Sequence, residues 1–167
     1  IEIIQTLLDK RGLSISADVI ISERKKMGYY YIESPDMKPF PYLIDFIRYL
    51  TDNNIKTALV TSTSGNLILS ALNRMKMTNM FNCIICGDMV NERKPNPECY
   101  LKAISFLSAD PENCLVFEDS HIGISAAKSA GIFTVAFTGS SVKHDISKAD
   151  YVMHSYKEAP EFIKNYI

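Results

Sequence analysis

The spacing of apolar and polar residues divides the chain into a short helical beginning and a longer part in which strands and helices alternate. Over residues 1–11, apolar side chains recur at positions 1, 3, 4, 7 and 8, a helical period that Gly12 ends. A second helix is predicted to begin at Ser16, which can cap it, and to run to about residue 32. We expect the two helices to pack on each other, and we assign no catalytic group to them.

From Asn53 onward, short apolar runs alternate with helical patterns. The predicted strands are 55–60, 83–86, 114–117, 132–137 and 151–153, and the predicted helices are 41–51, 66–75, 97–107, 121–130 and 157–166. This alternation indicates βαβ crossovers and an α/β fold, with a Rossmann-like parallel sheet flanked by helices. The proline-punctuated connection between the two parts predicts a helical domain over residues 1–36 and an α/β core over residues 37–167.

Composition narrows the classes of partner. The 167 residues are 47% hydrophobic, enough for one buried core with an appendage. The net charge of −1 and the lack of a basic block argue against nucleic acid and membrane surfaces as partners. No apolar run approaches the roughly 20 residues that span a bilayer, and no secretory signal is visible.

The chain has four cysteines, and two of them form a Cys-x-x-Cys pattern. Cys83 and Cys86 lie in an apolar, strand-like run, where their side chains would face opposite ways. No second pair or histidine stands at zinc-binding spacing. We therefore expect free thiols and a reducing, cytoplasmic location.

Two adjacent carboxylates follow the predicted strand 114–117. Glu118 and Asp119 would lie at the carboxyl edge of the sheet, where α/β folds bind ligands, and Ser120 can cap a helix that ends at Gly131. A hard cation such as Mg²⁺ is held by one or two carboxylates, and Asp119, on the turn, is the better direct ligand. The alternative is that Asp119 caps the helix and Glu118 is solvated.

Two further positions could bind a phosphate. The strand 55–60 runs into four hydroxyl residues and a glycine, beginning with Thr61 and Ser62, just before a helix whose N-terminus favours anions. Lys94 is held by Pro95 on a stiff segment ahead of another helix and presents a point charge. Each has an ordinary alternative, a helix cap and a surface lysine, but a hydroxyl, a lysine and an acid pair together are typical of phosphoryl transfer.

On these residues the chain resembles the haloacid dehalogenase (HAD) superfamily, in the branch of β-phosphoglucomutases and phosphoglycolate-type phosphatases. Val60–Ser62 is similar to the second motif of that family, Lys94-Pro95-x-Pro97 to the third, and Phe117-Glu-Asp-Ser-x-x-Gly123 to the fourth. The resemblance extends from about Pro39 to the end of the chain, and the first two helices resemble part of the small helical cap of such enzymes.

The resemblance implies a role for each matched residue. Thr61 would bind the transferring phosphoryl oxygen, with the Ser62 backbone beside it. Lys94 would neutralise the nucleophile and the phosphate, and Glu118 and Asp119 would hold Mg²⁺ directly or through water.

The first motif of the family, an Asp-x-Asp after an amino-terminal strand, has no counterpart here. Asp9, Asp18, Asp36, Asp45 and Asp52 all lack the required context. In the family, that strand lies between the strand ending at Thr61 and the strand ending at Glu118, and its first Asp is the nucleophile. We therefore expect the strand to come from a preceding segment of the same protein or from a separate polypeptide.

The favoured function is Mg²⁺-dependent phosphoryl transfer on a small phosphorylated metabolite, by a phosphatase or a phosphomutase. It would pass through an aspartyl phosphate whose Asp lies outside this chain, so that the chain alone would be inactive. A receiver domain would need its acid pair ahead of the hydroxyl residue, and here the pair comes last. A non-catalytic phosphate-binding or structural fragment is the alternative that stays open.

Overall fold

The computed structural model describes residues 2–23, 26, 34, 37–139 and 145–166, and the chain divides into two compact units, residues 1–37 and 38–167. In the first unit, α1 (Glu2–Lys10) is followed by Gly12 with a left-handed φ of 65°. Residues 17–23 are helical, and the Val19 N–H donates to the side chain of Ser16, the predicted cap. Most of the predicted continuation to residue 32 lies outside the described residues. The assignment of this unit to a cap stays a prediction.

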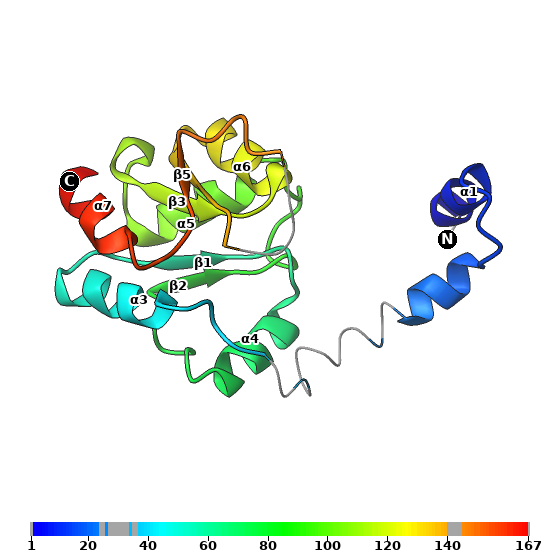
Figure 1. The fold of residues 1–167 in the computed structure, drawn as a ribbon, viewed down its shortest axis with the longest axis horizontal. Helices are drawn as coiled ribbons and strands as arrows, with labels where there is room; N and C mark the ends of the chain where they lie inside the picture. The colour runs from blue at the N-terminus through cyan, green and yellow to red at the C-terminus, as the bar shows by residue number, and fades with distance from the viewer. Residues whose placement is uncertain (1, 24–25, 27–33, 35–36, 140–144, 167) are drawn as a thin grey trace. The chain divides into compact units, whose positions relative to one another are not determined.

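The second unit has an α/β fold in which strands and helices alternate, as predicted (Figure 1). Its helices and strands are α3 (Leu43–Asp52), β1 (Ala58–Val60), α4 (Gly65–Arg74), β2 (Cys83–Ile85), α5 (Glu98–Leu107), β3 (Leu115–Glu118), α6 (His121–Ser129), β4 (Phe133–Phe137), β5 (Tyr151–Met153) and α7 (Ala159–Tyr166). The main differences from the prediction are in the residues at which helices and strands begin. Helix α3 begins after Tyr42, whose φ of 65° is not helical, and β1 is shorter than expected.

All strand pairs are parallel, but the strands form two sheets rather than one. Strand β1 pairs with β2, and β3 pairs with β4, which pairs with β5. Figure 1 shows the β1–β2 pair apart from β3 and β5. Within the described residues, no strand lies between β1 and β3 and the two are not paired directly. One edge of each therefore faces away from its own sheet.

A cavity of about 820 Å³, here called the interstrand slot, runs along these two edges. Every residue of β1 and of β3 lines it, together with apolar side chains of α3, α5 and α7. Because successive strand residues point to opposite faces, lining by all of them places the slot at the strand edges rather than over one face. All residues of β1 and β3 are only half-buried, whereas four of the five in β4 are buried. Strands of parallel sheets are normally buried on both faces, so the half-buried residues of β1 and β3 indicate that these two strands are incompletely covered.

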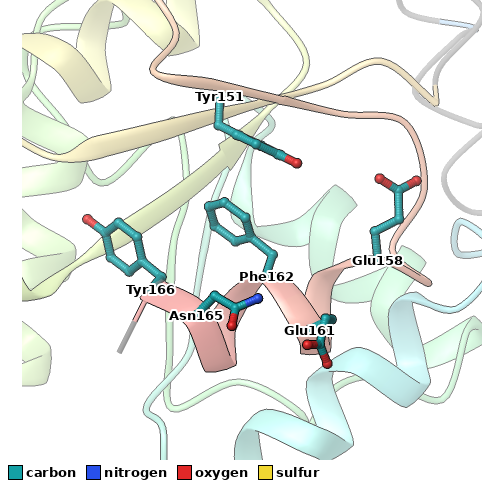
Figure 2. Close-up of a pocket in the computed structure, with 6 residues that line it drawn as sticks. All are labelled: Tyr151, Glu158, Glu161, Phe162, Asn165 and Tyr166. Atoms are coloured by element: carbon teal, nitrogen blue, oxygen red, sulfur yellow. The ribbon is translucent and has the colours of Figure 1, made fainter.

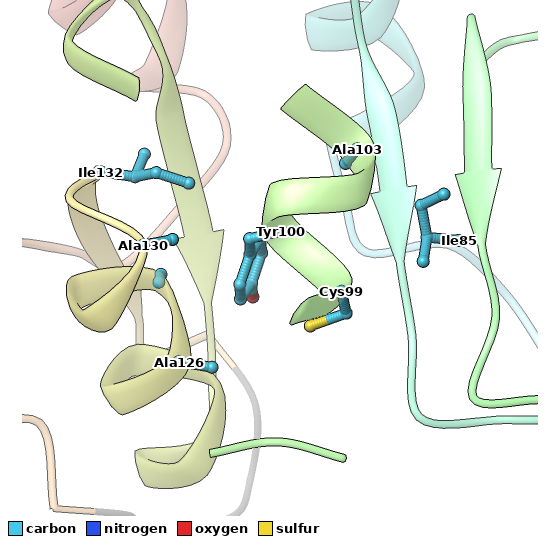
Figure 3. Close-up of a cluster of buried hydrophobic side chains, with 8 residues drawn as sticks. Ile85, Cys99, Tyr100, Ala103, Ala126, Ala130 and Ile132 are labelled. Atoms are coloured by element: carbon cyan, nitrogen blue, oxygen red, sulfur yellow. The ribbon is translucent and has the colours of Figure 1, made fainter. Parts of the chain in front are cut away.

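The core that positions the site lies between α5, α6 and the two sheets. Figure 3 shows Tyr100 pointing from α5 toward β3, with Ala126 on α6 close by. The buried members of this cluster are Ile85, Cys99, Tyr100, Ala103, Ala126, Ala127, Ala130 and Ile132. Small side chains on α6 let that helix lie close to its neighbours, and Gly131 follows it with the predicted left-handed φ of 76°.

Three further observations bear on the sequence predictions. All four cysteines are free thiols. No helix within the described ranges has the length and apolar character that a membrane crossing requires. A pocket of about 410 Å³ lies beside α7 and β5 (Figure 2), and none of the predicted site residues lines it.

Candidate active site

Lys94 lies where the carboxyl ends of the two sheets approach each other. Its Nζ donates to the carbonyl oxygen of Val60, the last residue of β1, at 3.4 Å. The same ammonium forms an ion pair with the carboxylate of Glu118, the last residue of β3. The side chains of Lys94 and Glu118 are only 7% and 9% exposed. The alternatives of a surface lysine and of a solvated Glu118 are therefore wrong.

Both carboxylate oxygens of Glu118 accept hydrogen bonds from the protein. Oε1 accepts from the Tyr100 hydroxyl at 2.5 Å and from Lys94. Oε2 accepts from the Ser120 hydroxyl at 3.0 Å and from the Ser120 backbone N–H at 3.4 Å. Burial raises the pKa of the Glu118 carboxyl, but the Lys94 ammonium and these hydrogen bonds outweigh it, so that the pKa lies below its ordinary value. Burial and then the Glu118 charge raise the pKa of the Tyr100 phenol, which remains a protonated donor.

Gly123 makes the space that Glu118 occupies. A Cβ at this position would lie 2.0 Å from the Glu118 Cδ, far inside contact distance. The N–H of Gly123 donates to Ser120 Oγ at 3.1 Å, which confirms Ser120 as the cap of α6. The glycine and the serine of the fourth motif thus hold the Glu118 carboxylate over the first turn of α6.

Asp119 has a different environment from Glu118. It is exposed, and its side chain makes no hydrogen bond or ion pair with any residue that the structure describes. Ser120, not Asp119, caps α6, so the alternative role of Asp119 as the cap is wrong. An exposed carboxylate beside a buried, ionised one suits a hard cation that keeps several waters. No group of three His, Cys, Asp or Glu residues within the described ranges is placed to hold a metal, so Glu118 and Asp119 would have to bind a cation together with water molecules.

Thr61 and Ser62 follow β1 in a loop that β2 holds in place. The Thr61 N–H donates to the carbonyl of Ile85 at 2.9 Å, and its hydroxyl accepts from the Thr63 N–H at 3.1 Å. Gly87 packs against the same loop, where a Cβ would lie 2.2 Å from the Ser62 carbonyl oxygen. Ser62 itself is exposed. The loop is therefore fixed in place while Ser62 remains open to solvent.

At the N-terminus of α4, the first N–H already has a partner within the protein. Both carboxylate oxygens of Asp88 accept from the Gly65 N–H, each at 3.1 Å, and the Ser64 side chain makes no capping bond. The Gly65 N–H, the first of α4, is thus occupied by Asp88, while the binding of a phosphate at this helix N-terminus stays a prediction. Thr61 and Ser62 remain as the phosphate-binding candidates in this loop.

The segment that carries Lys94 is held by Glu98. The Glu98 carboxylate accepts from the backbone N–H groups of Asn91 and Glu92, with distances of 2.7–3.1 Å, and pairs with Lys102 at 2.9 Å. The bond to Lys102 and then the two backbone bonds lower the pKa of Glu98 to about 2. The Lys94–Pro95 peptide bond is cis.

Lys94 and Glu118 are thus in direct contact. Thr61 and Ser62 follow Val60, whose carbonyl Lys94 contacts, and Asp119 directly follows Glu118. No role of Tyr100, Gly87, Asp88 or Glu98 was predicted from the sequence. Only Tyr100 leaves a signal in the sequence, because it lies on the same helical stripe as Ala103.

The sequence model of the haloacid dehalogenase-like hydrolase family matches residues 3–137. The chain belongs to this family. The matched range includes Thr61, Lys94, Glu118 and Asp119.

Within the family, the chain is similar in sequence to two phosphatases and in structure to a solved β-phosphoglucomutase. It is 40% identical over 112 residues to a phosphorylated carbohydrates phosphatase of Thermotoga maritima, covering 67% of this chain and 50% of the relative. It is 31% identical over 99 residues to phosphoglycolate phosphatase 1 of Pseudomonas aeruginosa, covering 59% of this chain and 36% of the relative. A crystal structure of β-phosphoglucomutase from Clostridium difficile matches with a TM-score of 0.73 and 28% identity, covering 98% of this chain and 74% of that one. The chain thus spans half or less of the length of these two relatives.

Proposed function

We propose that this HAD chain forms most of the core of a Mg²⁺-dependent phosphatase or phosphomutase that acts on a small phosphorylated metabolite. The observation that carries the proposal is the buried Lys94 ammonium, which touches the carboxyl ends of both β1 and β3. Thr61 follows one of these ends and Asp119 the other. The names of the relatives, which act on phosphorylated carbohydrates and phosphoglycolate, support the class of substrate.

In this proposal, three groups bind the transferring phosphoryl group. The Thr61 hydroxyl and the Ser62 N–H donate to its oxygens from the loop after β1. Lys94 neutralises the charge that develops on these oxygens, and its burial makes that charge more effective than it would be in water. Positioning and charge neutralisation are the main requirements of phosphoryl transfer.

Asp119 and Glu118 would hold the Mg²⁺. Both Glu118 oxygens are already occupied by donors of the protein, so Asp119 would be the direct ligand and Glu118 would act through a water molecule. When bound, the cation would offset the negative charge of the phosphoryl oxygens.

The proposed nucleophile is an aspartate outside these 167 residues. We propose that a preceding segment of the same protein enters the interstrand slot as a parallel strand, with the aspartate at its carboxyl end near Lys94. The unpaired edges of β1 and β3, their half-exposed residues and the 820 Å³ of apolar space between them support this arrangement. The aspartate oxygen would attack phosphorus while the substrate oxygen leaves and takes up a proton, and water would then hydrolyse the aspartyl phosphate.

The first test is hydrolysis of p-nitrophenyl phosphate by the parent protein, with and without Mg²⁺. We expect Mg²⁺-dependent activity that falls at least 100-fold in Asp119→Asn and in Lys94→Met, because each loses a charge next to the phosphoryl group. Asp52→Asn on α3 is the matched control, since Asp52 is also an exposed carboxylate. An inert parent protein would refute the proposal and support a non-catalytic fragment.

The second test adds the missing strand to the chain in trans. The 167-residue chain is mixed with a synthetic peptide that has the sequence of the preceding segment, and both binding and hydrolysis are measured. We expect no hydrolysis by the chain alone and Mg²⁺-dependent hydrolysis in the mixture, whereas a scrambled peptide restores nothing. Equal activity of the chain alone and of the parent protein would refute the placement of the nucleophile outside the chain.

A further inference from the structure

Tyr100 contacts both charged groups of the site. Its hydroxyl donates to Glu118 Oε1 at 2.5 Å and accepts from Lys94 Nζ at 3.1 Å. Its ring also lies under the ammonium, with Nζ 4.8 Å from the ring centroid. Lys94, Tyr100 and Glu118 therefore form a closed ring of hydrogen bonds, in which each residue contacts the other two.

From this geometry we infer that Tyr100 is a positioning residue of the phosphoryl-transfer site, acting through Lys94. The inference rests on the proposed function. An ammonium at the end of a four-carbon stem has three donors and little directional preference of its own. Two of these donors are held by Tyr100 and Glu118, and the third is directed to the carbonyl of Val60.

Tyr100 matters for the site because it helps to direct the third donor of Lys94 toward the phosphate-binding loop. Val60 immediately precedes Thr61 and Ser62, the residues proposed to bind the phosphate. The bond to the Val60 carbonyl, at 3.4 Å, is longer than the bond to Tyr100, at 3.1 Å. An incoming phosphoryl oxygen beside Thr61 would therefore take this donor with the least loss, while Tyr100 and Glu118 keep Nζ in place.

The ring of Tyr100 has a separate, structural role. Tyr100 is 4% exposed and packs within the cluster that includes Ile85 and Ala126 (Figure 3). Truncation to Ala would leave a cavity and destabilise the fold. Tyr100→Phe keeps the ring, its packing and its contact with the ammonium, and it removes only the hydroxyl, so it separates the two roles.

The experiment is steady-state hydrolysis of p-nitrophenyl phosphate by the parent protein with Tyr100→Phe. We expect kcat to fall about tenfold, the loss of one hydrogen bond to charged groups, while KM changes less than twofold. Tyr49→Phe on α3 is the matched control, since Tyr49 is a partly buried tyrosine that packs in a different cluster. We expect kcat of Tyr49→Phe to equal that of the wild type.

Two more measurements distinguish positioning from packing. In a Lys94→Met background, assayed at high enzyme concentration, Tyr100→Phe should cause no further loss, because its effect passes through Lys94. The thermal midpoints of Tyr100→Phe and Tyr49→Phe should agree within a few degrees. An unchanged kcat in Tyr100→Phe, or an equal loss in the Lys94→Met background, would overturn this inference while the proposed function stands. A wild-type parent without phosphatase activity would overturn both.

Discussion

Substitution of Gly123 by Ala should disturb the site without touching any of its charged residues. In the present structure the added Cβ would lie 2.0 Å from the Glu118 Cδ, and ordinary contact begins at 3.4 Å. The carboxyl carbon would therefore have to move by at least about 1.4 Å, the difference between these two distances. A shift of that size breaks the hydrogen bonds that Glu118 accepts from Tyr100 and Lys94.

The size of the effect follows from two opposing contributions. Breaking a buried ion pair costs about 3–5 kcal/mol when one partner is removed, and somewhat less when the carboxylate is only displaced. Replacing a helical glycine by alanine returns about 1 kcal/mol of helix propensity. We expect Gly123→Ala to lower the free energy of unfolding by about 2–4 kcal/mol, and the midpoint by roughly 4–16 °C for a protein of this size.

Gly65→Ala is the matched control, because Gly65 also lies in the first turn of a helix that follows a strand. There the new Cβ would meet Asp88 oxygens at 3.6–3.7 Å, an ordinary contact. Urea unfolding of both variants should show Gly65→Ala unchanged or slightly more stable and Gly123→Ala clearly less stable. Equal stabilities would refute the argument that Gly123 makes the space for Glu118.

Substitutions of Gly87 and Glu98 should also have measurable effects. Gly87→Ala should raise KM for p-nitrophenyl phosphate severalfold in steady-state kinetics, because the added Cβ would displace Ser62. An unchanged KM would contradict a role of Ser62 in phosphate binding. Glu98→Gln should destabilise the protein above about pH 4.5. The hydrogen bond to Lys102 and two backbone bonds lower the folded-state pKa of Glu98 from 4.5 to about 2, so its contribution is present above pH 4.5 and lost as the pH falls toward 2. Urea unfolding between pH 2 and 7 should show the difference between Glu98→Gln and wild type shrinking with acidity; a constant difference would contradict it.

The fold was predictable because its signals are local. Each strand is a short apolar run bounded by polar residues, and each helix of the second unit has a periodic apolar face, so the elements of that unit appear within a few residues of the predicted places. The separation into two sheets was only partly predictable. We propose that it depends on a strand outside these residues, and the sequence pointed to such a strand only through the resemblance to a family.

The candidate site was predictable where residues adjacent in the sequence share one task. Ser120 and Gly123 support Glu118 within a single turn, so their pattern can be read directly. Tyr100 and Asp88 contact the site from other elements, at sequence distances of 18 and 23 residues from their partners. Such contacts depend on how α5 and β2 pack, which periodicity does not determine. The bond from the Gly65 N–H to Asp88 could not be predicted for the same reason.

The unpaired edges of β1 and β3, beside the interstrand slot, affect how readily these residues aggregate during synthesis. An uncovered edge of a parallel strand is a template on which another copy of the chain can pair, and apolar surroundings favour such exchange. Chains emerge from the ribosome amino end first, so a segment encoded ahead of Ile1 would already be present when β1 and β3 form. If the proposed strand precedes these residues, producing the 167 residues by themselves would remove that early cover and favour aggregates, and translating both together would suppress them.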